Sequence, residues 1–159
     1  MHRWKKLMCF VALTVGFPAA AEAELEIKRW NPEGMSQPVG YRQVVTVEGS
    51  PKKWIFLGGK AGIYPDDTFP ESLEDQANLT FDNIDLALKA AGATRSDVVD
   101  IQIYIVDLAN IDPNPAYQAV RDFFPANAKP TSMVIGVSAL AYPGLLIEIN
   151  VTAVVQADE

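Results

Sequence analysis

An acidic side chain stands inside an apolar run near the C-terminus, in the segment LLIEINVTAVV at 145–155. An unpaired carboxylate on an apolar surface is costly, so Glu148 must find a partner or shift its pKa. In a strand the side chains alternate between two faces, which puts Glu148 on the same face as Asn150 and Thr152. A carboxylate held on such a polar face could move a proton to and from a bound water. The alternatives are a pair with a basic residue or simple exposure to solvent.

The first 23 residues have the layout of a secretory signal peptide. A basic opening, MHRWKK, precedes the apolar stretch LMCFVALTVGF, and AEA at 21–23 has the small-x-small form of a cleavage site. The apolar stretch is shorter than a membrane span requires. We therefore expect cleavage after Ala23, export to the periplasm or the medium, and no membrane contact afterwards. An uncleaved N-terminal anchor is the alternative.

Removal of this segment changes the chemistry that is available. His2 and Cys9 are the one histidine and the one cysteine of the 159 residues, so residues 24–159 hold neither. Thiol nucleophiles, histidine bases, cysteine zinc sites and disulfides are then excluded. We expect no metal and no cofactor.

The charge of the remaining chain also limits its partners. The segment 1–23 holds three of the 13 basic residues and one of the 20 acidic residues, which leaves 10 against 19 and a formal net charge of −9. Without a basic run, nucleic-acid binding is not expected. The length of 24–159 is typical of a single domain.

Periodicity predicts the elements that must position these side chains, in the order β-β-α-β-α-β-β. An apolar stripe with steps of 4 and 3 predicts a helix over 73–91, with Ser72 as its N-cap and Gly92 as its C-cap. A shorter helix is expected over 114–124. The strands are expected in the segments 41–49, 53–59, 94–108, 132–140 and 145–155, the first two of them as a hairpin after an extended arm.

This order predicts an α+β fold with a single β-sheet and two helices on one of its faces. The other face of the sheet would be uncovered. Several strands also carry apolar residues on that second face, among which we count Val106 and Val134. An exposed apolar sheet face usually marks an interface, so a symmetric homo-oligomer is expected.

The chain resembles the Rid (YjgF-type) family, whose best-studied members hydrolyse reactive enamines and imines. The resemblance runs from about Val39 to Val155 and depends on the order of seven landmarks. These are VGYRQVV, IFLGG, LTFDNIDLALKAAGAT, DVVDIQIYIVDL, AYQAVRDFF, KPTSM and IEINVTAVV. It implies a chorismate-mutase-like homotrimer with a small-molecule cleft between each pair of adjacent subunits.

The resemblance also implies site residues. Glu148 matches the family's glutamate and would be the catalytic acid–base, and Tyr41 matches a tyrosine that binds substrate. Asn114 matches an asparagine early in the second helix, where a helix N-cap is the alternative. Gly58 stands where the family has a serine before a glycine, although a bulge or turn would explain Gly58 and Gly59 equally well.

One departure concerns the landmark KPTSM. Catalytic members carry an arginine two positions after the proline, which clamps the substrate carboxylate, and this chain has Ser132 there. A hydroxyl supplies no charge. Lys129, Arg121 or Lys60 could reach in from elsewhere. Two hypotheses follow: an exported hydrolase or deaminase acting on C=N bonds through Glu148, with altered substrates, or a non-catalytic trimer that binds a small ligand.

Overall fold

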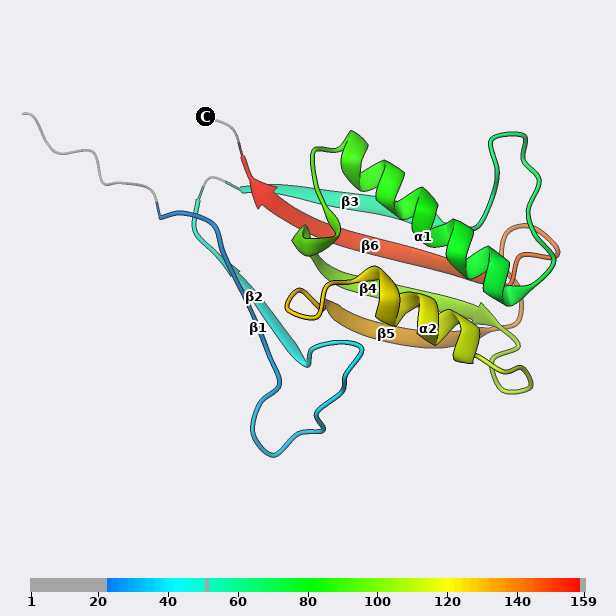
Figure 1. Ribbon diagram of the computed structural model, residues 1–159, viewed down its shortest axis with the longest axis horizontal. Helices are drawn as coiled ribbons and strands as arrows, with labels where there is room; N and C mark the ends of the chain where they lie inside the picture. The colour runs from blue at the N-terminus through cyan, green and yellow to red at the C-terminus, as the bar shows by residue number, and fades with distance from the viewer. Residues whose placement is uncertain (1–22, 51, 158–159) are drawn as a thin grey trace, which may run out of the picture.

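The computed structural model describes residues 23–50 and 52–157, and the predicted signal peptide lies outside them apart from Ala23. Six strands, two α-helices and one short 3-10 helix follow one another along this part of the chain (Figure 1). In order they are β1 (Glu26–Trp30), β2 (Val44–Glu48), β3 (Lys52–Lys60), α1 (Leu73–Ala90), η1 (Arg95–Asp97), β4 (Val98–Val106), α2 (Asn114–Phe123), β5 (Thr131–Val137) and β6 (Ile147–Gln156).

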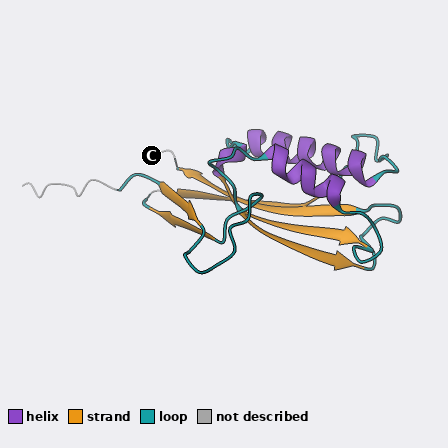
Figure 2. Cartoon of the chain, turned by 60° about the horizontal axis from the view of Figure 1, so that its bottom comes forward, coloured by secondary structure: helices purple, strands orange, loops and turns teal. Residues whose placement is uncertain are grey.

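The main sheet has four strands in the order β3-β6-β4-β5. β6 runs antiparallel to both of its neighbours, whereas β4 and β5 are parallel. Parallel neighbours need a crossover, and α2 provides it. Both helices cover the same face of this sheet, and the described elements leave most of the other face uncovered (Figures 1 and 2). The predicted α+β class, with two helices on one face of a sheet, is confirmed.

The expected hairpin of the first two strands is wrong. β2 pairs with β1, from Glu48 opposite Glu26 to Val44 opposite Trp30, and the two strands form a separate ribbon. Figure 1 shows this ribbon standing apart from the main sheet. The guanidinium of Arg29 attaches the ribbon to the main body by donating to the carbonyl oxygens of Ser96 and Val98. The stretch predicted as an extended arm therefore contains the strand that pairs with β2.

Helix α1 begins as its sequence predicts, but it ends at Ala90, one residue earlier than predicted, and its C-cap is Ala91 with Gly92 directly after it. The side chain of Ser72 accepts a hydrogen bond from the backbone N–H of Asp75, which satisfies a donor at the helix N-terminus. Gly92 adopts a φ of 78°, and the N–H of Ala93 beyond it donates to the carbonyl of Leu88. The stripe of Ala77, Phe81, Ile84 and Leu88 is buried against the sheet.

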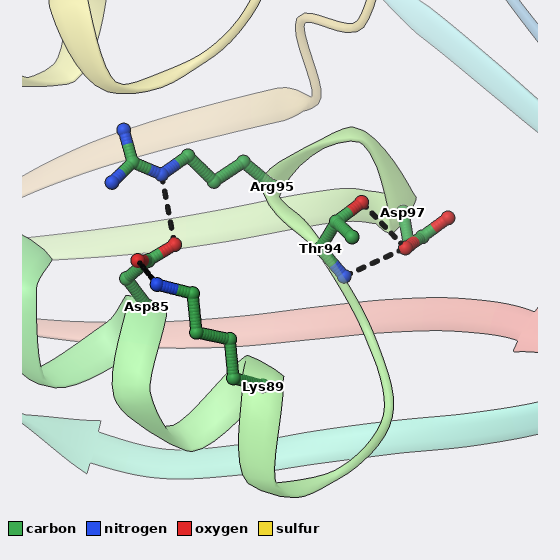
Figure 3. A network of polar contacts seen from close by, with 5 residues as sticks. All are labelled: Asp85, Lys89, Thr94, Arg95 and Asp97. Atoms are coloured by element: carbon green, nitrogen blue, oxygen red, sulfur yellow. Dashed lines mark hydrogen bonds and ion pairs between the residues drawn. The ribbon is translucent and has the colours of Figure 1, made fainter.

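A polar network holds the segment after α1 in place (Figure 3). The carboxylate of Asp85 accepts from Nε of Arg95 at 2.8 Å and from Nζ of Lys89 at 2.6 Å. Arg95 and then Lys89 lower the pKa of Asp85 to about 2. Thr94 and Asp97 close the turn, since the Asp97 carboxylate accepts from both the N–H and the hydroxyl of Thr94. The network therefore ties η1 and the start of β4 to α1.

The uncovered face of the sheet carries large apolar side chains, and of the two residues that the sequence suggested for it, Val106 lies there and Val134 does not. Phe56 is 74% exposed, and Trp54 on the same strand and Met133 on β5 are also exposed. Val134 is on the opposite face, since its partner in the ladder is Ile103, which is buried beneath the helices. The inference of an uncovered apolar face holds, with Val134 removed from it.

Candidate functional site

A cleft of about 470 Å³ opens on the helix side of the sheet, beside its edge strand β5. It brings together two residues that the sequence predicted for the site, Tyr41 and Ser132. The other lining residues are Val39, Gly40, Ile103, Tyr117, Val120, Arg121 and Val134. The walls are mainly apolar, and the two tyrosines, Ser132 and Arg121 supply the polar groups. The arrangement suits a small ligand with an apolar body and a few polar atoms.

Tyr41 reaches the cleft on the segment between the ribbon strands, and the next residue fixes that segment. The N–H of Arg42 donates to the carbonyl of Pro130 at 2.9 Å. The guanidinium of Arg42 donates to the carbonyls of Tyr41 and Ala126. These bonds hold the backbone of Tyr41 against the stretch that leads into β5, where Ser132 follows.

Ser132 lies on the covered face of β5. Its ladder partner is Ile101, a fully buried core residue, whereas the preceding Thr131 bonds to Asp100 on the other face. Paired residues in a sheet point to the same side, so the hydroxyl of Ser132 belongs to the helix side. It meets the cleft there, half-buried.

Glu148 lies on the opposite, uncovered face. It pairs across the ladder with Tyr104, while its neighbours Ile147 and Ile149 are fully buried under the helices. Its carboxylate lies over Gly59: a Cβ at that position would be 1.8 Å from Oε1 and 2.6 Å from the carboxyl carbon. Within one chain, the sheet therefore separates Glu148 from the cleft of Tyr41 and Ser132.

Gly58 is on the same side as Glu148, in a bulge of β3 that falls between Leu57 and Lys60. It borders a smaller hollow of about 280 Å³ together with polar side chains of β4 and β6. A Cβ at Gly58 would meet no atom within 4 Å. The two glycines thus differ, because one faces open space and the other leaves room for the glutamate.

Asn114 is not part of the cleft. It is exposed and borders a hollow between α1 and α2 instead. It is not the N-cap of α2 either, since Pro113 occupies that position and the carboxylate of Asp112 accepts from the N–H of Asn114. Three other residues of α2 line the cleft instead, namely Tyr117, Val120 and Arg121. The hydroxyl of Tyr117, a polar group on the helix predicted over 114–124, was the signal in the sequence.

The structure distinguishes the three basic residues that could stand in for a missing arginine. Lys129 is buried, and its Nζ donates to the carbonyls of Arg121 and Phe124 at the end of α2. Burial lowers the pKa of Lys129, and the neighbouring charge of Arg42 lowers it further. Lys60 lies at the end of β3, opposite Ile149 and away from the cleft. Arg121 alone among the three lines the cleft.

A buried glutamine fixes where β6, and with it Glu148, begins. The side-chain amide of Gln76 on α1 donates to the carbonyls of Pro70 and Gly144 and accepts from the N–H of Leu146 at 2.7 Å. All of its hydrogen-bonding groups are thus used, as a fully buried amide requires. The described residues contain no cluster of three acidic residues that could hold a metal ion, and none of their helices is long and apolar enough to span a membrane.

Comparison with known proteins gives consistent matches. The protein family described as endoribonuclease L-PSP matches residues 35–155. A RutC family protein of Aquifex aeolicus is 33% identical over 121 residues, which cover 74% of this chain and 90% of that protein. A 2-iminobutanoate/2-iminopropanoate deaminase of Dermatophagoides farinae is 30% identical over 107 residues, which cover 65% of this chain and 78% of that protein.

Solved structures agree with these matches. A Rid family protein of unknown function from Yersinia pestis, YyfB, superposes with a TM-score of 0.70 at 29% identity and covers 80% of this chain and 97% of its own. TdcF of Escherichia coli, solved with bound serine, gives a TM-score of 0.58 at 25% identity and covers 65% of this chain and 81% of its own.

Proposed function

Since the chain belongs to the Rid (YjgF, endoribonuclease L-PSP) family, we propose that it is an exported protein that hydrolyses small imines or enamines in clefts between subunits. Glu148 would be the catalytic residue, and Tyr41 and Ser132 would bind the substrate. Gly58 would line the approach to Glu148. Asn114 is left out of this proposal because it lies outside the cleft.

One observation carries the proposal, namely that Glu148 and Ser132 lie on opposite faces of one sheet. A single chain therefore cannot bring them to one ligand, whereas a second copy packed against the uncovered face could offer its own cleft to Glu148. The exposed Trp54 and Phe56 on that face supply the apolar surface that such packing would bury. A closed ring of identical interfaces, such as the proposed homotrimer, would contain the same composite cleft at each seam.

The chemistry needs only a carboxylate, a water molecule and the substrate. Glu148 would accept a proton from the water as its oxygen attacks the carbon of the C=N bond. The same proton, returned to the nitrogen, would give a carbinolamine that collapses to the carbonyl product and ammonia. Gly59 would leave Glu148 the room to adopt this position. Tyr41 and Ser132 would orient the polar end of the substrate.

Hydrolysis of 2-iminopropionate generated in situ tests the proposal directly. The purified chain should accelerate the reaction above the uncatalysed rate, and Glu148→Gln should lose about a hundredfold or more of that acceleration. Glu48→Gln, which removes a carboxylate from the exposed ribbon, is the matched control and should match wild type. Absence of any acceleration by the folded wild-type protein would refute the hydrolase assignment for this substrate.

The second candidate is a non-catalytic trimer that binds a small ligand, and Ser132 is the residue that favours it. Without the arginine at this position, the cleft lacks the clamp that catalytic family members use. Binding of a stable ligand without turnover of any imine would support this alternative. The same assays therefore separate the two candidates.

An RNA substrate is not proposed, although the family description names an endoribonuclease. The chain carries a formal net charge of −7 even with its basic N-terminus, so its long-range field repels a polyanion. The cleft itself contains a single cationic side chain, Arg121. A small molecule fits these features better.

A further inference from the structure

The cleft of Tyr41 and Ser132 contains one charged side chain, and that side chain comes from the helix rather than from the strand. Arg121 lies on α2, one turn after Tyr117, and both line the cleft. Ser132, opposite them on β5, brings no charge. Within one chain, any electrostatic preference of this cleft for its ligand therefore depends on Arg121.

The other described arginines are occupied by structural contacts. Arg29 and Arg42 bind backbone carbonyl oxygens that hold the ribbon and the following segment in place. Arg95 is paired with Asp85 and stacks over the ring of Phe123 at 4.3 Å. Arg121 is exposed, and none of the ion pairs in residues 23–50 and 52–157 includes it. Its charge is therefore available to a ligand.

A side-chain amide holds the guanidinium of Arg121 in place. Nη2 donates to Oε1 of Gln118 at 2.6 Å, and Nε2 of the same amide donates to Asp122 at 2.7 Å. The second bond orients the amide so that its oxygen faces Arg121. On the other side, Gly40 packs next to the aliphatic stem, since a Cβ there would be 3.7 Å from Cγ of Arg121. The stem is thus confined, while most donors of the guanidinium remain free.

We propose that Arg121 is the anion anchor of this cleft and that the ligand is a small carboxylate with an apolar tail. A guanidinium presents parallel N–H groups that match a carboxylate, which an ammonium or a hydroxyl does not. Tyr41 and Ser132 line the same cleft, where their hydroxyls would supply further donors, and Val120 and Val134 would receive the apolar tail. This inference rests on the proposed function only in taking this cleft as the ligand site.

Binding of 2-oxobutanoate, a stable carbonyl compound, tests the inference independently of turnover. Calorimetry should show binding of 2-oxobutanoate to the full chain at millimolar concentrations, and much weaker binding of its neutral amide, 2-oxobutanamide. Arg121→Gln should weaken binding of the acid by about tenfold or more, because a charged hydrogen bond is lost. Arg121→Lys keeps the positive charge but loses the paired N–H groups of the guanidinium, so its affinity for 2-oxobutanoate should lie between those of wild type and Arg121→Gln. Lys28→Gln removes one positive charge from the ribbon and is the matched control.

Three results would overturn the inference: equal affinity for the acid and the amide, unchanged affinity in Arg121→Gln, or no binding of 2-oxobutanoate by folded wild-type protein. Failure of the proposed function looks different. If the protein binds the acid through Arg121 but hydrolyses no imine, the inference about Arg121 stands and the proposed hydrolase function is refuted. If Arg121→Gln hydrolyses 2-iminopropionate as fast as wild type does, the hydrolase function stands and the inference about Arg121 is refuted.

Discussion

The carboxylate of Glu148 occupies the space that a side chain at position 59 would fill. Oε1 lies 1.8 Å from the place of a Cβ on Gly59, much closer than two such atoms can approach. The φ of Gly59 is not in the left-handed region, so the glycine is needed for space and not for its backbone conformation. Gly59 in the bulge of β3 and Glu148 on β6 are therefore structurally coupled, although they are 89 positions apart along the chain.

Gly59→Ala should displace the Glu148 carboxylate while leaving the fold intact. The methyl group meets only side-chain atoms, so Glu148 can rotate away at a cost of about 1 kcal/mol. The carboxyl carbon signal of Glu148 in a ¹³C NMR titration should move, and any imine hydrolysis should fall toward that of Glu148→Gln. Gly58→Ala is the matched control for the NMR signal, since its methyl group faces open space. An unchanged Glu148 signal in Gly59→Ala would contradict the relationship.

Ser132→Arg should increase hydrolysis of 2-iminopropionate, because it places a carboxylate clamp at the position that catalytic relatives use. The same substitution should also restore binding of 2-oxobutanoate to Arg121→Gln by about tenfold, since either arginine would then face the cleft. Ser132→Gln, which adds length without charge, controls for filling of the cleft. If neither activity nor binding increases, the cleft differs from that of the catalytic relatives by more than one side chain.

Phe56→Glu should dissociate the proposed trimer. A charge at the most exposed aromatic residue of the uncovered face would have to be desolvated in an interface, at a cost of about 2 kcal/mol or more. Light scattering after gel filtration should report a trimer for wild type and a monomer for the variant. Leu86→Glu changes an equally apolar exposed residue on α1, outside that face, and should remain trimeric. A monomeric wild type would remove the composite cleft from the proposal.

Asp85→Asn should destabilise the fold by about 1 kcal/mol near neutral pH, since the exposed ends of Arg95 and Lys89 are screened by solvent. The folded pKa of Asp85 is about 2, below its ordinary value of 3.8. Its stabilisation is therefore present above about pH 4 and lost as the pH falls toward about 2. Urea unfolding should give a higher free energy of unfolding for wild type than for Asp85→Asn near neutral pH, and this difference should disappear as the pH falls from about 4 to about 2.

Export with cleavage after Ala23 predicts a defined mature protein. Expression of the full sequence in a Gram-negative host should yield, in the periplasmic fraction, a chain whose intact mass corresponds to residues 24–159. Ala23→Arg should block processing, because a large charged residue does not fit the small-x-small rule. Retention of the whole sequence by the wild-type protein in the membrane fraction would favour the uncleaved anchor.

Elements defined by local periodicity could be predicted from the sequence. The stripe of α1, its Ser72 cap and its Gly92 terminus follow from residues a few positions apart, as does the alternation of β4 and β6. The pairing of β2 could not be derived in this way. The hydrogen bonds of β2 go to β1, about 18 residues earlier in the chain. The turn signal directly after β2 favoured pairing with the next strand, β3, instead.

The candidate site also has features that the local sequence predicted and features that only the tertiary structure decided. The sequence by itself made Glu148 and Tyr41 candidates and showed the absence of a charge at Ser132, because these depend on residue type within short motifs that resemble those of the family. Only the tertiary structure decided that the sheet separates Glu148 from Ser132, and that Arg121 lines the cleft whereas Asn114 does not. Which face a strand presents, and which turn of a helix borders a cleft, depend on contacts between distant segments, and no local pattern encodes them.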